Sequence, residues 1–87
     1  MDEPHDLLYH SLNEKVFIRL KHNRELRGQL LAYDEHLNLS LGDAEEKITL
    51  KQKEQLSGQE MVRVQKKLHG WLFVRGDLVV SVATGND

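Results

Sequence analysis

The 87-residue sequence predicts a mainly β fold, with one short N-terminal helix followed by a strongly bent, five-stranded antiparallel sheet that forms a small open barrel. Three observations predict this fold. Several segments alternate apolar and polar residues with a period of two, which is typical of strands with one buried face. Short polar turns separate these segments. A glycine, Gly28, lies inside one of them, where glycine usually marks a sharp bend or a close approach of another backbone.

Length and composition restrict the class of protein. The length suits a single domain over residues 1–87, and 39% apolar with 30% charged residues suits a globular domain rather than a disordered or membrane chain. The absence of cysteine excludes disulfides and thiolate metal sites, and no cofactor is expected. The net charge of −2 excludes the overall basic field of a non-specific nucleic-acid binder, so any RNA binding must come from a local site.

The N-terminal segment bears on localisation and on the first helix. Residues 1–4 are acidic and lack the basic and apolar regions of a signal peptide, so we expect an intracellular, soluble protein. The helix is expected from about Pro4, because proline suits the first helical turn, to about Leu12. Its apolar residues recur at helical spacing: Leu7, Leu8 and Leu12.

The first three strands follow from the change of period at Lys15. The first alternates through Val16, Ile18 and Leu20 and is expected to end at a tight turn at residues 22–23. The second covers residues 26–33 and leads into a turn at residues 34–36. The third alternates through Leu37, Leu39 and Leu41 and continues less regularly toward residue 50.

A polar segment divides these strands from the C-terminal ones. Residues 51–58 are polar and have no period, which predicts the longest loop of the chain, at about residues 51–60. An extended pattern resumes at residues 61–64, and the fourth strand is expected at residues 68–74. A tight turn at residues 75–77 then leads into a fifth strand at residues 78–82. The last five residues, 83–87, are expected to fray.

Two segments together resemble the two halves of the signature of the Sm and like-Sm (LSm) family. The first half, about residues 15–46, has a strand containing Gly28 and then the pattern Asp34-x-x-Leu37-Asn38. The second half, about residues 68–82, has an apolar strand, Arg75-Gly76 and another apolar strand. The variable loop between the halves and the leading helix also match. The resemblance extends over about residues 4–82, nearly the whole chain.

Within that family the sequence is most similar to the like-Sm branch, and there to the third subunit of the eukaryotic LSm rings. The stretches that carry this likeness are residues 24–28, 32–38, 41–46 and 72–77. The resemblance implies a non-enzymatic, RNA-binding subunit in a ring of seven different subunits that holds the uridine-rich 3′ ends of RNA. It implies a nuclear role in pre-mRNA splicing, through a small nuclear RNA, and a cytoplasmic role in mRNA decapping and decay, with the factors of both processes as partners. A subunit purified alone is expected to be able to form a non-native homo-oligomer.

The resemblance also implies which residues bind RNA, because two turns meet at the pore in this family. His36 and Arg75 are expected to stack on a base, and Asn38 to hydrogen-bond the edge of uracil. Gly76 is expected to allow a close approach of the nucleotide. Asp34 is expected to bond its own turn and to orient Asn38 and Arg75 without touching RNA. The plain alternative is that His36 is a solvated turn residue, Asn38 an ordinary exposed strand residue and Asp34 only a turn former.

Ring assembly in the family pairs the fourth strand of one subunit with the fifth strand of the next. Two apolar edge strands would expose a monomer to aggregation, and closing a ring removes those free edges. The residues expected at this interface are Leu72, Phe73, Val74, Val79, Val80 and Val82.

Other readings of the sequence remain open. The acidic balance suits a ring subunit that mediates only protein–protein contacts, and a homomeric Sm-like RNA chaperone is a second alternative. The remaining histidines lack the spacing of metal ligands, and no acid pair lies in a recognisable catalytic setting, so neither a metal site nor an active site is expected. The aromatic side chains expected in the core or at subunit interfaces, rather than on RNA, are Phe17, Trp71 and Phe73.

Overall fold

The computed structural model describes residues 4–84 of the chain, and residues 1–3 and 85–87 are outside this range. Its elements follow in the order α1 (Pro4–His10), β1 (Lys15–Leu20), β2 (Arg24–Tyr33), β3 (Leu39–Lys53), β4 (Glu60–Val74), a 3-10 turn (Gly76–Leu78) and β5 (Val79–Thr84). The predicted fold class is confirmed. The helix ends two residues earlier than expected. Two of the five residues expected to fray belong to β5, and the other three are outside the described residues.

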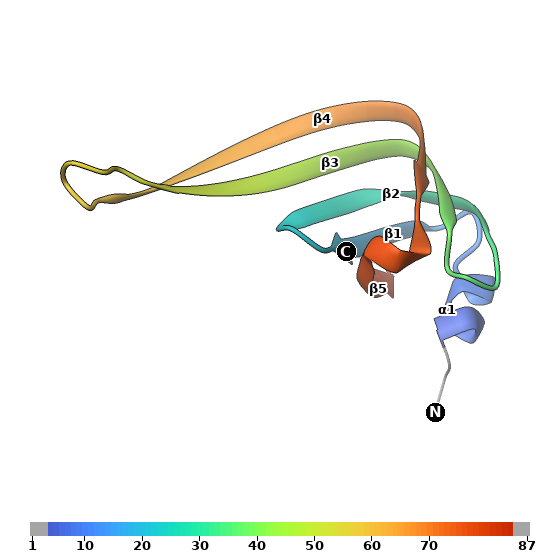
Figure 1. The fold of residues 1–87 in the computed structure, drawn as a ribbon. Helices are drawn as coiled ribbons and strands as arrows, with labels where there is room; N and C mark the ends of the chain where they lie inside the picture. Colours follow the sequence, from blue (N-terminus) through green and yellow to red (C-terminus); the bar gives the residue numbers. More distant parts are fainter. Residues whose placement is uncertain (1–3, 85–87) are drawn as a thin grey trace.

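The five strands form one antiparallel sheet in the order β4-β3-β2-β1-β5. Near its C-terminal end β4 bends sharply together with the start of β3, with which it stays paired up to Val74, and the chain then leads through the 3-10 turn into β5, which lies beside β1 (Figure 1). The sheet therefore curls on itself, and its two edges are β4 and β5. Among residues 4–84 no helix has the length and hydropathy needed to cross a membrane.

The hydrophobic core lies on the inner face of the curled sheet. Helix α1 contributes Leu8, which is fully buried. Each leucine or isoleucine buried here stabilises the fold by roughly 1.5–3 kcal/mol relative to an exposed side chain. The other core residues are Val16, Ile18, Leu20, Leu26, Leu30, Leu39, Leu41, Ala44 and Val74.

Gly28 lies where β2 and β3 approach most closely. A β-carbon at this position would lie 3.1 Å from the Cα of Ala44 and 3.1 Å from the carbonyl oxygen of Gly42. The strand register shifts at the same place, and Asp43 has a φ of 47°, which together define a β-bulge. The close approach predicted from Gly28 is confirmed. The bulge changes which residues of β3 point inward, from odd positions before it to even positions after it.

Strands β3 and β4 are 15 residues each and project beyond β2 as a two-stranded hairpin (Figure 1). We call residues 47–67 the arm. Pairing continues to Lys53 and Glu60, so the loop spans only residues 54–59, and the expectations of a loop at 51–60 and of a fourth strand beginning at 68 were wrong. Every side chain from residue 51 to residue 68 is exposed. Main-chain hydrogen bonds therefore hold the outer part of the arm, from residue 51 to residue 67, without a buried face.

Candidate nucleic-acid interface

The first turn of the candidate site, residues 34–38, is organised by one carboxylate. Oδ1 of Asp34 accepts hydrogen bonds from the main-chain N–H of His36 at 2.8 Å and from that of Asn38 at 3.0 Å. Oδ2 accepts a third from Nδ2 of Asn38 at 2.9 Å. These hydrogen bonds hold the pKa of Asp34 below its ordinary value, and the bond from the Asn38 side chain has the largest effect. Asp34 therefore fixes both the turn and the Asn38 side chain.

Leu37 completes this turn in a conformation that the sequence did not reveal. Its φ is 64°, in the left-handed region that leucine rarely adopts, and it precedes β3 instead of opening that strand as expected. Its partly buried side chain packs against the core. This packing helps to offset the backbone strain.

The second turn, after β4, is attached directly to the first. The Asn38 side chain accepts a hydrogen bond through Oδ1 from the main-chain N–H of Gly76 at 2.7 Å. A β-carbon at Gly76 would lie 1.9 Å from the carbonyl oxygen of His36. Residue 76 must therefore be glycine because the main chain of His36 crosses it. We had expected its small size to leave room for a nucleotide, whereas the structure explains it by the contact between the turns.

The docked turns present His36 and Arg75 to solvent. The side chain of His36 is 76% exposed and that of Arg75 is 71% exposed. The Arg75 guanidinium donates to Oδ2 of Asp77 at 3.0 Å, so its partner is Asp77 and not Asp34. One open hollow is lined by His36, Asn38, Phe73, Arg75, Gly76 and Asp77. The structure thus brings the four residues expected to bind RNA to one place.

Phe73 is the member of this hollow that sequence reasoning assigned elsewhere. It lies in β4 two residues before Arg75, so strand alternation directs both side chains to the same face of the sheet. Its side chain is about half exposed, at 52%. The spacing of two from Arg75 was the signal that could have indicated this place.

The amide of Asn38 retains hydrogen-bonding capacity after its internal contacts. A primary amide has two N–H donors and two acceptor lone pairs on its oxygen. Here Asp34 uses one donor and Gly76 uses one lone pair. One donor and one acceptor remain, in a fixed orientation beside an imidazole ring and a guanidinium plane. This arrangement suits a flat ligand whose edge offers both an acceptor and a donor, as a pyrimidine base does.

The residues expected at a ring interface are located at the two edge strands, with two kinds of side-chain environment. Val74 is buried in the core, and Leu72, Val79 and Val82 are partly buried against it. Phe73 and Val80 are exposed, at 52% and 58%. Pairing at these edges would therefore use the main chains of both strands, together with the side chains of Phe73 and Val80.

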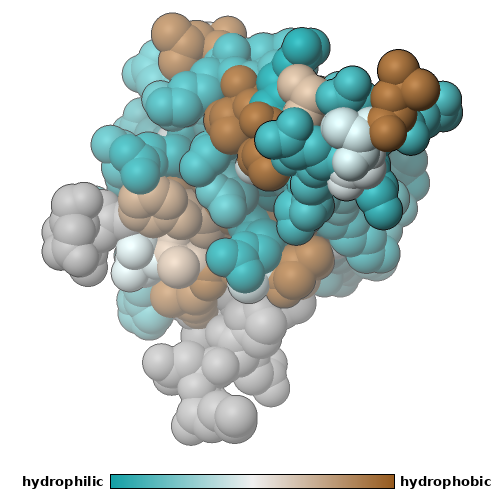
Figure 2. Space-filling model, turned by 90° about the vertical axis from the view of Figure 1, so that its left-hand side faces the viewer, coloured by the Kyte–Doolittle hydropathy of each residue, from teal (hydrophilic) through white to brown (hydrophobic). Residues whose placement is uncertain are grey.

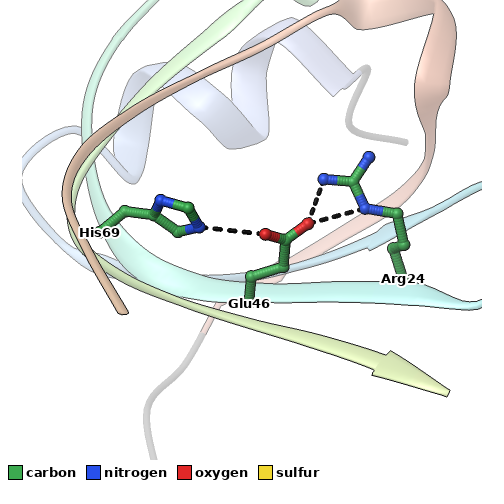
Figure 3. Close-up of polar contacts among 3 residues, drawn as sticks. All are labelled: Arg24, Glu46 and His69. Carbon is green, nitrogen blue, oxygen red and sulfur yellow. Dashed lines mark hydrogen bonds and ion pairs between the residues drawn. The ribbon is translucent and has the colours of Figure 1, made fainter. Parts of the chain in front are cut away.

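A buried ionic cluster at the root of the arm was missed by the sequence analysis. Glu46, only 4% exposed, accepts hydrogen bonds from Nε of Arg24 at 2.7 Å and from a second guanidinium nitrogen, and its Oε1 lies 3.0 Å from Nε2 of His69 (Figure 3). Burial raises the pKa of Glu46, but the hydrogen bonds and charges of Arg24 and His69 outweigh it and lower the pKa. The cluster connects β2, β3 and β4. Within residues 4–84 no group of three or more His, Cys, Asp or Glu side chains could hold a metal ion.

Comparison with known proteins adds to this geometry. The family model described as the LSM domain matches residues 6–84. The chain is 47% identical over 93% of its length to "Sm-like protein LSM3B" of Arabidopsis thaliana, covering 83% of that protein. It is also 47% identical over 93% of its length to "LSM complex subunit lsm3" of Schizosaccharomyces pombe, covering 87% of it. It is 43% identical over 95% of its length to "Probable U6 snRNA-associated Sm-like protein LSm3" of Dictyostelium discoideum, covering 86% of it.

Solved structures give the same result. The Sm protein of Pyrococcus abyssi, solved in complex with a uridine heptamer, superposes with a TM-score of 0.72 at 32% identity, covering 97% of this chain and all of that one. A heptameric archaeal Sm protein superposes with a TM-score of 0.63 at 30% identity, covering 91% and 96% of the two chains. The predicted resemblance, including the likeness to the third LSm subunit, is confirmed by these matches.

Proposed function

The chain belongs to the LSM-domain family, and on that premise we propose that it is an RNA-binding subunit of a seven-membered LSm ring. The observation that carries the proposal is the hydrogen bond from Gly76 to Asn38, which docks the two turns and brings His36, Asn38 and Arg75 to one hollow. The Pyrococcus abyssi protein with the same fold was solved with uridine RNA, which supports the same class of ligand here.

In this proposal each residue of the hollow has a separate task. His36 stacks on one face of a base and the guanidinium of Arg75 on the other, because both are exposed and planar. The free donor and acceptor of Asn38 bond the edge of uracil, which presents an acceptor next to a donor. Gly76 and Asp34 act through the main chain and through Asn38, so they set the position of the site rather than contact the base.

The two free edges of the sheet support assembly into a ring. Within residues 4–84, β4 is paired only with β3 and β5 only with β1, and pairing β4 of one subunit with β5 of the next would satisfy the main-chain groups of their outer sides. One base site per subunit is weak, because stacking contributes roughly 1–3 kcal/mol per base. A ring places several such sites on one strand and so raises the affinity.

The cellular role follows from the relatives by analogy. The Schizosaccharomyces pombe protein is named as an LSM complex subunit, and the Dictyostelium discoideum protein as U6 snRNA-associated. We infer that this chain joins a ring of seven different LSm subunits that binds uridine-rich 3′ ends. Its proposed roles are pre-mRNA splicing in the nucleus and mRNA decapping and decay in the cytoplasm, and they include no enzymatic step.

Substitution of both stacking residues tests the site. We expect His36→Ala with Arg75→Ala to weaken binding of oligouridine by the assembled ring about 10–100-fold, the equivalent of one base stack. The matched control is His22→Ala with Arg19→Ala, which removes the same residue types away from the hollow and should leave binding unchanged. Fluorescence anisotropy with labelled oligouridine measures both. Equal binding by the two double variants would exclude direct RNA contact and favour a role limited to protein contacts.

The native mass of the assembly purified from the source cells with a tagged copy tests the ring. Seven different small subunits with RNA attached are expected. A ring of this chain alone would overturn the mixed ring and favour the homomeric chaperone, an arrangement for which the archaeal heptamer provides a structural precedent.

A further inference from the structure

Charge is divided unevenly between the arm and the rest of the chain. Residues 47–67 contain six of the 12 lysines and arginines but only two of the 14 acids. The arm therefore carries a net charge of +4, whereas the remainder of the chain carries −6. The overall charge of −2 conceals this division, and a local basic surface on an acidic protein attracts anions only where the basic residues lie.

Strand register places acids opposite several cations of the arm, Glu25 opposite Lys47, Glu46 opposite Lys67 and Glu60 opposite Lys53, but the structure records no ion pair between them. Among residues 4–84 the ion pairs that the structure records join Arg24 and His69 to Glu46, His36 to Glu35, and Arg75 to Asp77, and none includes a cation of the arm. Two lysines of the arm even face each other, since Lys47 on β3 is directly opposite Lys66 on β4. Like charges in this position destabilise a strand pair. An anionic partner would remove that cost.

Several cations of the arm share one face of the hairpin. After the bulge, the odd positions of β3 point to the outer face of the sheet, away from the core, so Lys47, Lys51 and Lys53 share that face, and cross-strand register adds Lys66. A strand rises about 3.3 Å per residue, so Lys51 and Lys53 stand about 6.6 Å apart along it. This spacing is comparable to that of successive phosphates in an extended single strand. Arg63 and Lys67 extend the positive charge to the other face.

The surface has the composition of a backbone-binding site rather than of a base-binding one. Residues 47–67 contain no aromatic side chain on which a base could stack. Figure 2, viewed from the tip of the arm, shows a mainly hydrophilic surface with separate hydrophobic residues.

We propose that the arm is a second RNA-binding surface, which holds the sugar–phosphate backbone of a strand without reading its sequence. The inference deepens the proposed function, on which it rests for the class of ligand. The hollow at His36 and Arg75 selects uridine, and the arm binds RNA beyond the selected segment. Lysine suits this task because its ammonium is a compact charge on a flexible chain that follows a mobile phosphate backbone.

The test compares three RNAs: a short oligouridine, the same strand extended by oligoadenosine, and oligoadenosine alone. For the full chain with Lys51→Gln and Lys53→Gln, we expect unchanged affinity for short oligouridine and about tenfold weaker binding of both longer strands at low salt. The slope of log affinity against log salt concentration should decrease in magnitude by about 1.4, which corresponds to two lost phosphate contacts. The matched control, Lys15→Gln with Lys21→Gln, removes two exposed lysines outside the arm and should bind all three RNAs like the unaltered chain.

Each contrary result has a definite meaning. Unchanged affinity and salt dependence for the extended strand would overturn the proposal, as would an equal loss for all three RNAs, which would indicate a fault in assembly. If the arm binds poly-glutamate saturably and does not bind RNA, the proposal is wrong and the partner is an acidic protein. If the unaltered chain fails to bind short oligouridine, the proposed function is wrong, and arm-dependent binding of oligoadenosine still decides the inference.

Discussion

Strands β3 and β4 run through both the arm and the rest of the chain, which we call the body, but different forces hold the two regions in place. In the body, β3 buries Leu39, Leu41 and Ala44 against the core, and the burial of apolar surface stabilises the strand. In the arm, the same strand and its partner β4 expose every side chain from residue 51 to residue 68 and are joined by the main-chain ladder. Regular geometry therefore needs only backbone pairing, whereas stability needs burial. Substitutions in the body should change folding, and those in the arm should change binding.

Truncation of a core residue should give the largest difference between the two regions. We expect Leu41→Ala, at a fully buried position, to lower the free energy of unfolding by about 3 kcal/mol, because it loses transfer free energy and leaves a cavity. Val64→Ala, at a position 49% exposed in the arm, should change it by less than about 0.5 kcal/mol. Urea denaturation at one protein concentration measures both. Similar losses would mean that the arm is part of the cooperative core.

The boundary between the regions is tested at Glu46. We expect Glu46→Ala to lower the free energy of unfolding by about 2–3 kcal/mol, because Arg24 and His69 lose a buried charged acceptor. Glu60→Ala removes a carboxylate from the exposed end of the arm and should have almost no effect. The same denaturation experiment compares them, and an equally small change in both would show that the cluster does not secure the root of the arm.

Acid should weaken this cluster. The pKa of Glu46 is lowered in the folded protein, so its stabilising charge is fully present above the ordinary glutamate pKa and is lost as the pH falls through the lowered value. We expect the stability difference between the unaltered chain and Glu46→Gln to shrink on acidification from neutral pH into and below the ordinary range. Asp34 is present in both proteins, so its contribution to the pH dependence of stability cancels in the difference. A difference that is constant with pH would contradict the assigned cause.

Two glycines of the same segment distinguish the site from its surroundings. Gly76→Ala should separate the docked turns, because its β-carbon would collide with the His36 carbonyl, and we expect a stability loss of about 1–2 kcal/mol with clearly weaker oligouridine binding. Gly70→Ala adds its β-carbon to open space on β4, so stability should be unchanged or raised by up to about 1 kcal/mol, and binding should be kept. Anisotropy and urea denaturation on both variants decide it. Normal oligouridine binding by Gly76→Ala would show that RNA recognition does not depend on the contact between the two turns.

The sequence predicted the body far better than the arm, for physical reasons. Alternation at Val16, Ile18 and Leu20 indicated β1 correctly because those side chains are buried on one face. Gly28 indicated the close approach of β3 because only the absence of a β-carbon allows it. Within the arm, the extended pattern at residues 61–64 was recognised, but residues 51–60 were predicted as a loop because the strand ends there are exposed and hydrophobic periodicity arises only from burial. Its backbone pairing leaves almost no trace in composition.

The site was predicted through resemblance, and its internal logic was not. The residues His36, Asn38 and Arg75 were identified, but the contact between Asn38 and Gly76 joins positions 38 apart in sequence and follows only from the curl of the sheet. Glu46 was missed because the bulge at Asp43 reverses the inward positions of β3. Asp43 adopts a positive φ without being glycine, so the sequence does not mark that reversal.

The unlike edges of the sheet have a consequence for order. If β4 of one subunit pairs with β5 of the next, as proposed, each contact is head-to-tail rather than two-fold symmetric. A closed ring of such subunits is directional, because every subunit presents β4 to the neighbour on one side and β5 to the neighbour on the other. Exchanging two different neighbours would therefore create new junctions on every side of both. A mixed ring would be defined by its cyclic sequence of members as well as by their identities.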